Sequence, residues 1–139
     1  MSSAHEQVSA LAKLRDRYGL RVVAANALAL MLASWTPGDD MIRTGVLSGH
    51  AEHVIAYALS GAVMYAMLAP RFAAAYIVAA IVAYAGLLEL GQLFVPGRHA
   101  AVEDFLASTT GAVIGVVLCI VGGLARTKSR ARKGEAVED

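Results

Sequence analysis

Residues 72–95 read FAAAYIVAAIVAYAGLLELGQLFV, with Pro70 shortly before this apolar run and Pro96 directly after it. At 1.5 Å per residue, a helix of about 20 residues crosses the ~30 Å hydrocarbon core of a bilayer. Proline removes a backbone hydrogen bond from a helix interior, so the two prolines mark the limits of the run. The stretch therefore predicts a membrane-spanning helix that is flanked by two turns.

Three other segments have a similar length and apolar character, and they cover residues 20–36, 52–69 and 104–125. Open sheets cannot cross lipid, and the four segments are too long for the strands of a membrane barrel. The sequence therefore predicts an all-α fold, a bundle of four transmembrane helices that occupies residues 20–125 as one membrane domain.

The first of these segments has an alternative interpretation as a secretory signal, because basic residues precede a short apolar centre. Against this interpretation, the polar region before the centre is long, and Met31-Leu32-Ala33 is a poor cleavage site. Cleavage would leave the orientation of the later segments as before.

The composition excludes an ordinary water-soluble protein. The chain has 139 residues, a length that suits one domain. Hydrophobic residues make up 58% of the chain and charged residues 17%, whereas about 25% of residues are charged in soluble domains. The formal net charge of +1 argues against a nucleic-acid partner, since nucleic-acid-binding domains carry a marked basic excess on one face.

Basic residues are distributed unevenly along the chain. Of the 12 Lys and Arg residues, all except Arg43 and Arg98 lie around the start of the first segment, in the turn at Arg71, or after the last segment. Cytoplasmic loops of membrane proteins carry the excess of Lys and Arg. We therefore expect a protein of the cytoplasmic (inner) membrane with both termini cytoplasmic and with the loops 37–51 and 96–103 facing outward.

The two ends of the chain differ from the membrane domain in composition. Residues 1–19 place several apolar side chains near one face of a helix, so this cytoplasmic segment is either a short interfacial helix or a loosely ordered tail. Residues 126–139 are basic and polar and contain few large apolar side chains, so we expect a disordered cytoplasmic tail.

Polar side chains are costly in lipid, at about 2.5–3.5 kcal/mol for a central Asp, Lys or Arg, and here they gather at the outer ends of the predicted helices. His53 and Tyr57 are spaced so that they share a helix face, and so are Glu89 and Gln92. Glu89 lies about 10 Å below the outer helix end at Pro96, at 1.5 Å per residue, so its carboxyl group should point into the bundle. The residues expected to form an outward-facing polar site are His53, Tyr57, Glu89, Gln92, Arg98, Asp104 and Ser108.

Two further features predict contacts between helices. Gly111 and Gly115 form a Gly-x-x-x-Gly pair, which permits close approach of membrane helices. Asn26 lies in the first segment, away from the polar site, and we expect it to form an interhelical hydrogen bond.

Two motifs resemble those of the VanZ-like family. The first comprises Glu89-Leu-Gly-Gln92, then Pro96-Gly97-Arg98, Asp104 and Gly111. The second is His53-Val-Ile-Ala-Tyr57 in the second segment. Together the motifs extend from the second predicted helix through the fourth, and the expected layout of four spans also fits this family.

The chain departs from the family pattern at three positions. Gly49 and His50 stand where the family usually has Asp and Lys, and Ser108 stands where it usually has Asn. The resemblance implies a small integral membrane protein related to one associated with reduced susceptibility to teicoplanin, a glycopeptide antibiotic. It implies no biochemical mechanism.

Three roles remain open for the polar site. It could be a buried network that fixes how the helices meet, formed by Glu89, Gln92, Arg98 and Asp104. It could be a pocket for an amphipathic ligand, such as a membrane lipid, a lipid-linked cell-wall precursor or a lipoglycopeptide, with Arg98 at the anionic group. It could also belong to an intramembrane enzyme that acts on a lipid-linked cell-wall substrate, with Glu89 and His53 as acid and base.

No cofactor is expected from the sequence. A metal site formed by His50, His53, Glu89 and Asp104 is chemically possible. However, His50-x-x-His53 matches no known closed ligand pattern, so the sequence predicts no metal. Four spans offer few walls for a transport pathway unless subunits assemble, and a homo-oligomer remains open.

Overall fold

The computed structural model describes residues 2–37 and 48–135, and this part of the chain is helical apart from its turns. The helices are α1 (Ser2–Trp35), α2 (Gly49–Leu68), α3 (Ala74–Gln92) and α4 (Val102–Glu135). Each contains a stretch long and apolar enough to cross a membrane, and these stretches are Arg15–Trp35, Gly49–Leu68, Ala74–Gln92 and Val102–Thr127. The predicted all-α bundle of four transmembrane helices is confirmed.

α3 is shorter than the predicted segment 72–95. The three residues that precede Pro96 bond their N–H groups to carbonyls three residues earlier, at 3.3, 3.1 and 3.0 Å, which is the tighter pattern of a 3₁₀ turn. Pro96 has no N–H group with which to continue the helix. Gly97 follows with a φ of 71°, a left-handed conformation that glycine adopts without strain. The helix therefore ends one turn before the proline, and the chain turns toward α4.

Both ends of the described chain are helical. Of the two alternatives for residues 1–19, the structure shows a helix that is continuous with the first span from Ser2 onward; its position at a membrane surface stays a prediction. α4 continues to Glu135, so residues 126–135 are helical where we expected disorder. Residues 124–133 read LARTKSRARK, and Ala, Leu, Arg and Lys are good helix formers. Residues 136–139 of the expected tail lie outside the described residues.

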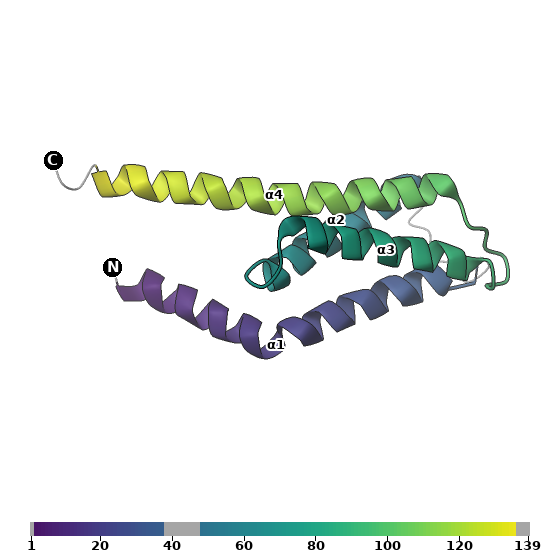
Figure 1. The fold of residues 1–139 in the computed structure, drawn as a ribbon, viewed down its shortest axis with the longest axis horizontal. Coiled ribbons are helices and arrows are strands. Elements are labelled where there is room, and N and C mark those ends of the chain that lie inside the picture. The colour runs from purple at the N-terminus through teal and green to yellow at the C-terminus, as the bar shows by residue number, and fades with distance from the viewer. Residues whose placement is uncertain (1, 38–47, 136–139) are drawn as a thin grey trace.

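α2, α3 and α4 pack against one another, and α1 contacts both α2 and α3 (Figure 1). Consecutive helices run in opposite directions, and α4 extends well past its neighbours toward the C-terminus. The ends marked N and C lie at the same end of the bundle, and the loop between α3 and α4 lies at the other. The start of α2, the end of α3 and the start of α4 therefore meet at the end away from the termini.

α2 and α4 approach each other with their backbones in contact. A Cβ atom on Gly111 would meet the carbonyl group of Val54, and one on Gly115 would meet that of Ala58, both well inside van der Waals distance. Gly61 on α2 meets the backbone of α4 in the same way. Small residues of this kind allow membrane helices to pack closely, and the Gly-x-x-x-Gly pair lies within this contact.

The core lies among α2, α3 and α4, and its buried residues are Tyr57, Ile77, Ile81, Ala85 and Ala112. α1 is joined to the core through polar contacts. Ser60 Oγ donates a hydrogen bond to Asn26 Oδ1 at 3.1 Å, and the Tyr84 hydroxyl donates to the Ala27 carbonyl at 2.8 Å. The interhelical hydrogen bond expected for Asn26 is confirmed.

Candidate functional site

The candidate site lies at the end of the bundle away from both termini. His53 is near the start of α2, Glu89 is near the end of α3, and Asp104 is in the first turn of α4. Ser48 caps α2, because its side-chain oxygen accepts a hydrogen bond from the N–H of Ala51 at 3.3 Å. The alternating direction of the helices brings these distant parts of the chain to one level.

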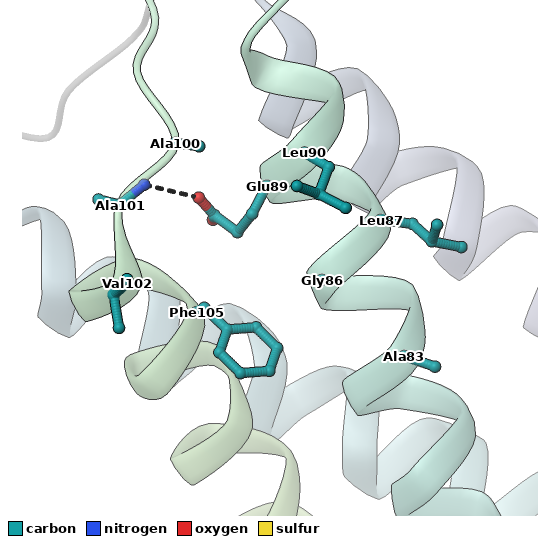
Figure 2. Close-up of a pocket in the computed structure, with 9 residues that line it drawn as sticks. All are labelled: Ala83, Gly86, Leu87, Glu89, Leu90, Ala100, Ala101, Val102 and Phe105. Carbon is teal, nitrogen blue, oxygen red and sulfur yellow. Dashed lines mark hydrogen bonds between the residues drawn. The ribbon is translucent and has the colours of Figure 1, made fainter.

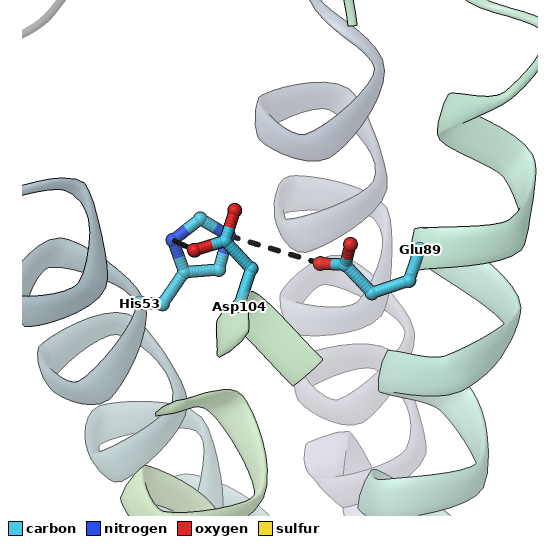
Figure 3. Close-up of side chains that lie close together, drawn as sticks. All are labelled: His53, Glu89 and Asp104. Atoms are coloured by element: carbon cyan, nitrogen blue, oxygen red, sulfur yellow. Dashed lines mark ion pairs between the residues drawn. The ribbon is translucent and has the colours of Figure 1, made fainter. Parts of the chain in front are cut away.

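His53, Glu89 and Asp104 form a compact cluster (Figure 3). Nε2 of His53 lies 3.9 Å from Oε1 of Glu89, and Nδ1 of His53 lies 4.0 Å from Oδ1 of Asp104. One nitrogen or oxygen atom from each side chain lies within 4.8 Å of those of the other two. Two carboxylates therefore face one imidazole ring at distances longer than a hydrogen bond.

The ring of His53 is oriented by the backbone of its own helix. Its Nδ1 atom lies 2.9 Å from the carbonyl oxygen of Gly49. Because a carbonyl group can only accept, Nδ1 carries the proton of this hydrogen bond. In the neutral ring Nε2 then holds the lone pair, and this is the atom that faces Glu89.

Glu89 is only 7% exposed, and its carboxylate connects two parts of the site. Oε2 accepts a hydrogen bond at 3.3 Å from the backbone N–H of Ala101, directly before α4 begins (Figure 2). Oε1 faces His53. The carboxyl group thus lies between helices, in the position that its depth in the predicted helix suggested.

Gln92 and Arg98 bind Ser34 at the end of α1. Nε2 of Gln92 donates to Ser34 Oγ at 2.9 Å. Arg98 donates to the Ser34 carbonyl from Nε at 3.3 Å and from Nη2 at 2.9 Å. Of the four residues considered from the sequence as one network, Gln92 and Arg98 thus anchor α1, while Glu89 and Asp104 face His53, and Arg98 is also within electrostatic reach of Glu89.

Ser34, Trp35 and His50 border the site but were not among the predicted site residues. Ser34 carried a signal that could have identified it, namely a hydroxyl group near the outer end of an apolar segment. Nε1 of Trp35 donates to the carbonyl of Leu88 at 3.2 Å, a contact with no sequence signal. His50 Nε2 lies 3.6 Å from Oδ1 of Asp104, so a side chain able to carry positive charge occupies the position where the VanZ-like motif usually has Lys.

Tyr57 and Ser108 form a second layer of the site, one turn deeper. Each lies four residues after a member of the cluster, Tyr57 after His53 and Ser108 after Asp104, so each shares a helix face with that member. Both are buried, with exposures of 6% and 0%. Ser108 Oγ is within electrostatic reach of the Tyr57 hydroxyl, yet it has no well-formed hydrogen bond among the described residues. Buried polar atoms without a partner are uncommon in folded proteins.

Two hollows adjoin the cluster. The apolar crevice, of about 450 Å³, lies between α3 and α4 (Figure 2), and its apolar walls include Ala83, Gly86, Leu87, Leu90, Val102 and Phe105. The second hollow, of about 160 Å³, has Leu30, Ala33 and Ala56 in its walls, and we call it the polar hollow because the side chains of Ser34, Glu52, His53, Tyr57 and Arg98 also line it. Glu89 lines the crevice and His53 lines the hollow, so the two facing side chains stand between the crevice and the hollow.

The site lies within a segment that matches a known protein family. The family model described as VanZ/LLP1 matches residues 8–124, which contain all seven of the predicted site residues. No curated protein and no solved structure shows significant similarity to the chain.

Proposed function

The chain belongs to the VanZ/LLP1 family and is a multi-pass membrane protein, and we propose that it binds an amphipathic ligand of the cell envelope at the cluster of His53, Glu89 and Asp104. The position of Glu89 supports this proposal, because Glu89 lines the apolar crevice and faces His53 of the polar hollow. In the proposed complex the tail lies in the crevice and the head meets Glu89 and His53, whose side chains have to move apart for the head to reach Arg98 in the polar hollow.

The apolar crevice suits a hydrocarbon tail. Its volume of about 450 Å³ falls within the range of roughly 300–1,000 Å³ that is usual for small-molecule sites. Leu87, Leu90 and Val102 in its walls are 64%, 60% and 71% exposed. Because these residues belong to membrane-spanning helices, a tail can enter the crevice from the surrounding lipid.

The polar hollow suits an anionic headgroup. Arg98 lines it together with His53, Glu52 and the hydroxyl groups of Ser34 and Tyr57. The guanidinium group of Arg98 holds the Ser34 carbonyl through Nε and Nη2, and its positive charge favours the oxygens of a phosphate or a carboxylate nearby. In the proposed complex Arg98 contacts the anionic group, while His53 and Glu89 orient the remainder of the head.

We place this site on the outer side of the cytoplasmic membrane, with both termini cytoplasmic. The N and C ends lie opposite the cluster (Figure 1), and basic residues concentrate near them. Since cytoplasmic flanks carry the excess of Lys and Arg, this distribution supports the proposed orientation.

The proposed ligands share one chemistry, a long apolar tail joined to a polar head. Membrane lipids, lipid-linked cell-wall precursors and lipoglycopeptides all have this form. The resemblance of the motifs to those of the VanZ-like family favours a role in susceptibility to teicoplanin, with the protein acting on the lipoglycopeptide or on the precursor that the antibiotic recognises.

The only tryptophan of the chain provides a test of ligand binding. Trp35 is hydrogen-bonded to the carbonyl of Leu88, the residue before Glu89. In neutral-detergent micelles, a cell-wall lipid precursor with a dansyl group on its head should accept energy from Trp35 in a saturable manner, and the unlabelled precursor should reverse the signal. Transfer that rises linearly without saturation would contradict specific binding.

Matched variants on α3 locate the tail. Ala83→Leu fills the crevice and should weaken binding about tenfold, which corresponds to about 1.4 kcal/mol. Ala80→Leu lies on the same helix at an exposed position outside the crevice lining and should leave binding unchanged. If both variants weakened precursor binding equally, the crevice would not be the binding site of the tail.

Susceptibility measurements test the biological role. A strain without the gene should become more susceptible to teicoplanin than the parent strain, with vancomycin as the comparison. The wild-type gene should restore the parent level, and Glu89→Gln should not, although the variant protein is present in the membrane at the wild-type amount. Identical susceptibility of the parent and the deletion strain would oppose the role in teicoplanin susceptibility.

A second candidate function is an intramembrane enzyme that acts on a lipid-linked cell-wall substrate. The 3.9 Å between His53 Nε2 and Glu89 Oε1 favours it, because a base and an acid that lie next to each other can share proton transfer. Mass spectrometry of the precursor after incubation with the protein would detect turnover. Turnover that is lost in both His53→Gln and Glu89→Gln would establish the enzyme, whereas saturable binding without turnover supports the first function.

A further inference from the structure

We propose that His53, Glu89 and Asp104 bind one divalent transition-metal ion, of the class to which Zn²⁺ belongs. The three side chains come from α2, α3 and α4, and one nitrogen or oxygen atom of each lies within 4.8 Å of those of the others (Figure 3). This site does not rest on the proposed amphipathic ligand, because the metal alone suffices to test it.

The spacing of these atoms approaches that of a coordination shell. With metal–ligand bonds of about 2.0–2.2 Å, two ligand atoms of a tetrahedral ion lie roughly 3.3–3.6 Å apart. His53 Nε2 and Glu89 Oε1 are separated by 3.9 Å, so a small rotation of either side chain brings both within bonding distance of one ion. The same separation exceeds the roughly 3.2 Å limit of an N–H···O hydrogen bond.

The hydrogen bond of His53 prepares its ring for a metal. Metal-binding histidines almost always donate their second ring N–H to a carbonyl group or a carboxylate, which fixes the tautomer. In His53 the Nδ1 proton is donated to the Gly49 carbonyl at 2.9 Å. The Nε2 lone pair of the neutral ring then points at the oxygen of Glu89, and a proton or a metal ion between two such electron-rich atoms relieves their repulsion.

Each of the two carboxylates also has a neighbouring group besides His53. Oε2 of Glu89 is held by the backbone N–H of Ala101 at 3.3 Å, which leaves Oε1 toward His53. Asp104 has His50 Nε2 at 3.6 Å from its Oδ1 atom. Hydrogen-bonded partners orient ligating carboxylates in metal sites, so His53 and Glu89 each have a group that positions them, while His50 places a ring nitrogen beside Asp104.

The charge of the cluster favours a divalent ion. Two carboxylates near one another at the end of membrane-spanning helices carry a high desolvation cost, and Glu89 is only 7% exposed. A protonated His53 would offset one negative charge, whereas a divalent ion offsets both. Ser108, one turn below Asp104 on the same face, adds a fully buried hydroxyl that also interacts with Tyr57.

The mixture of donors indicates the type of metal. Imidazole nitrogen suits Zn²⁺ and its neighbours in the first transition row, whereas Mg²⁺ and Ca²⁺ prefer oxygen ligands only. Three protein ligands leave a coordination position open to water or to an oxygen of a bound molecule, as in catalytic zinc sites. The sequence predicted no metal because His50-x-x-His53 was the only local pattern, and the ligand set that the fold assembles lies on three separate helices.

The test uses the full-length protein, purified without a polyhistidine tag, stripped with a chelator and held in neutral detergent. Isothermal titration with Zn²⁺ should show one equivalent bound, and Co²⁺ should give the visible absorption of a nitrogen- and oxygen-ligated ion. Mg²⁺ in about 100-fold excess should not displace either metal. Absence of a saturable 1:1 interaction with both Zn²⁺ and Co²⁺ would overturn the site.

Variants assign the ligands. His53→Ala, Glu89→Gln and Asp104→Asn should each raise the Kd for Zn²⁺ by at least about tenfold. His99→Ala and Glu103→Gln change exposed residues of the same types near the cluster and should leave the Kd unchanged. Melting temperatures without metal verify that each variant is folded, and equal weakening in the two control variants would contradict the assignment. Metal binding without saturable precursor binding would support this site and contradict the proposed function. Saturable precursor binding without metal binding would support the proposed function and contradict this site.

Discussion

Nε2 of His53 on α2 lies 3.9 Å from Oε1 of Glu89 on α3, and the other ring nitrogen of His53 bonds to the Gly49 carbonyl at 2.9 Å. The ring is thus oriented by its own helix and presented to a carboxylate on a neighbouring one. Its position relative to Glu89 and Asp104 depends on how the three helices are packed, so variants that alter helix contacts test the basis of the site.

Gly115→Ala should loosen the contact between α2 and α4. Its Cβ atom would meet the carbonyl of Ala58, which is backbone and cannot rotate away. The expected loss is about 1–3 kcal/mol of unfolding free energy, measured by denaturation in mixed micelles. Gly122→Ala on the same helix has open space around its Cβ atom and should not lower the stability. A neutral Gly115→Ala variant would mean that the backbones are farther apart than described.

The hydrogen bond between Gln92 and Ser34 should contribute measurably to the docking of α1. Ser34→Ala and Gln92→Ala each remove one partner of the 2.9 Å contact, and neither removes the Ser34 carbonyl that Arg98 binds. A double-mutant cycle on the unfolding free energy should give a coupling of about 1 kcal/mol. A coupling indistinguishable from zero would show that the two side chains do not interact.

Gly91→Ala should displace the indole ring of Trp35. A Cβ atom at Gly91 would lie 2.6 Å from the ring, so the bond from Trp35 Nε1 to the Leu88 carbonyl should break. The emission maximum of this only tryptophan reports the change directly. Gly86→Ala, whose Cβ atom would make an ordinary 3.5 Å contact with Phe105, should leave the emission of the protein as it is in the wild type.

Ser60→Ala should lower the stability of the protein by more than the loss of a single oxygen atom suggests. It leaves Oδ1 of Asn26 without the hydrogen bond that the Ser60 hydroxyl donates at 3.1 Å, a loss of about 1–3 kcal/mol for a buried group. The double variant Asn26→Leu, Ser60→Ala replaces both partners with apolar groups and should recover most of that stability. Thermal melting of the single and double variants compares them; a double variant less stable than Ser60→Ala would oppose this account.

Cysteine labelling tests the orientation in the membrane. Cys119 is the only cysteine of the chain, so Cys119→Ala provides a background for single exposed sites. His99→Cys should react with an impermeant maleimide added to intact cells, because its loop is expected outside by the distribution of basic residues. Arg126→Cys should react only after permeabilisation, and labelling in the reverse order would invert the proposed topology.

The four spans were predictable because the length and apolar character of each segment are local properties of the sequence. Pro70 and Pro96 marked the turns, but the structure ends α3 one turn before Pro96, since the last residues adopt a tighter hydrogen-bond pattern. The helical continuation of α4 to Glu135 differs from the predicted disorder because Ala, Arg and Lys are good helix formers, whereas a polar composition with few large apolar residues is also typical of disordered segments.

The site was predictable as a region and not as a set of contacts. Glu89 and Gln92 share a face in an ideal helix, yet one faces His53 and the other Ser34. Which neighbour each side chain meets depends on the rotation and the crossing of whole helices, which no spacing within one segment specifies. For the same reason the contact of His50 with Asp104 could be found only in the assembled bundle.

The close approach of α2 and α4 has a consequence for the cluster. Gly111 meets the backbone of Val54, the residue that follows His53 along α2, and Asp104 lies two turns before Gly111 along α4. The two backbones are in direct contact here, so main-chain atoms and not flexible side chains set the spacing of the two helices next to the cluster. The positions of His53 and Asp104 relative to each other are therefore preorganised by contact between the main chains. A ligand meets the two groups already aligned, so little binding free energy is lost in ordering them.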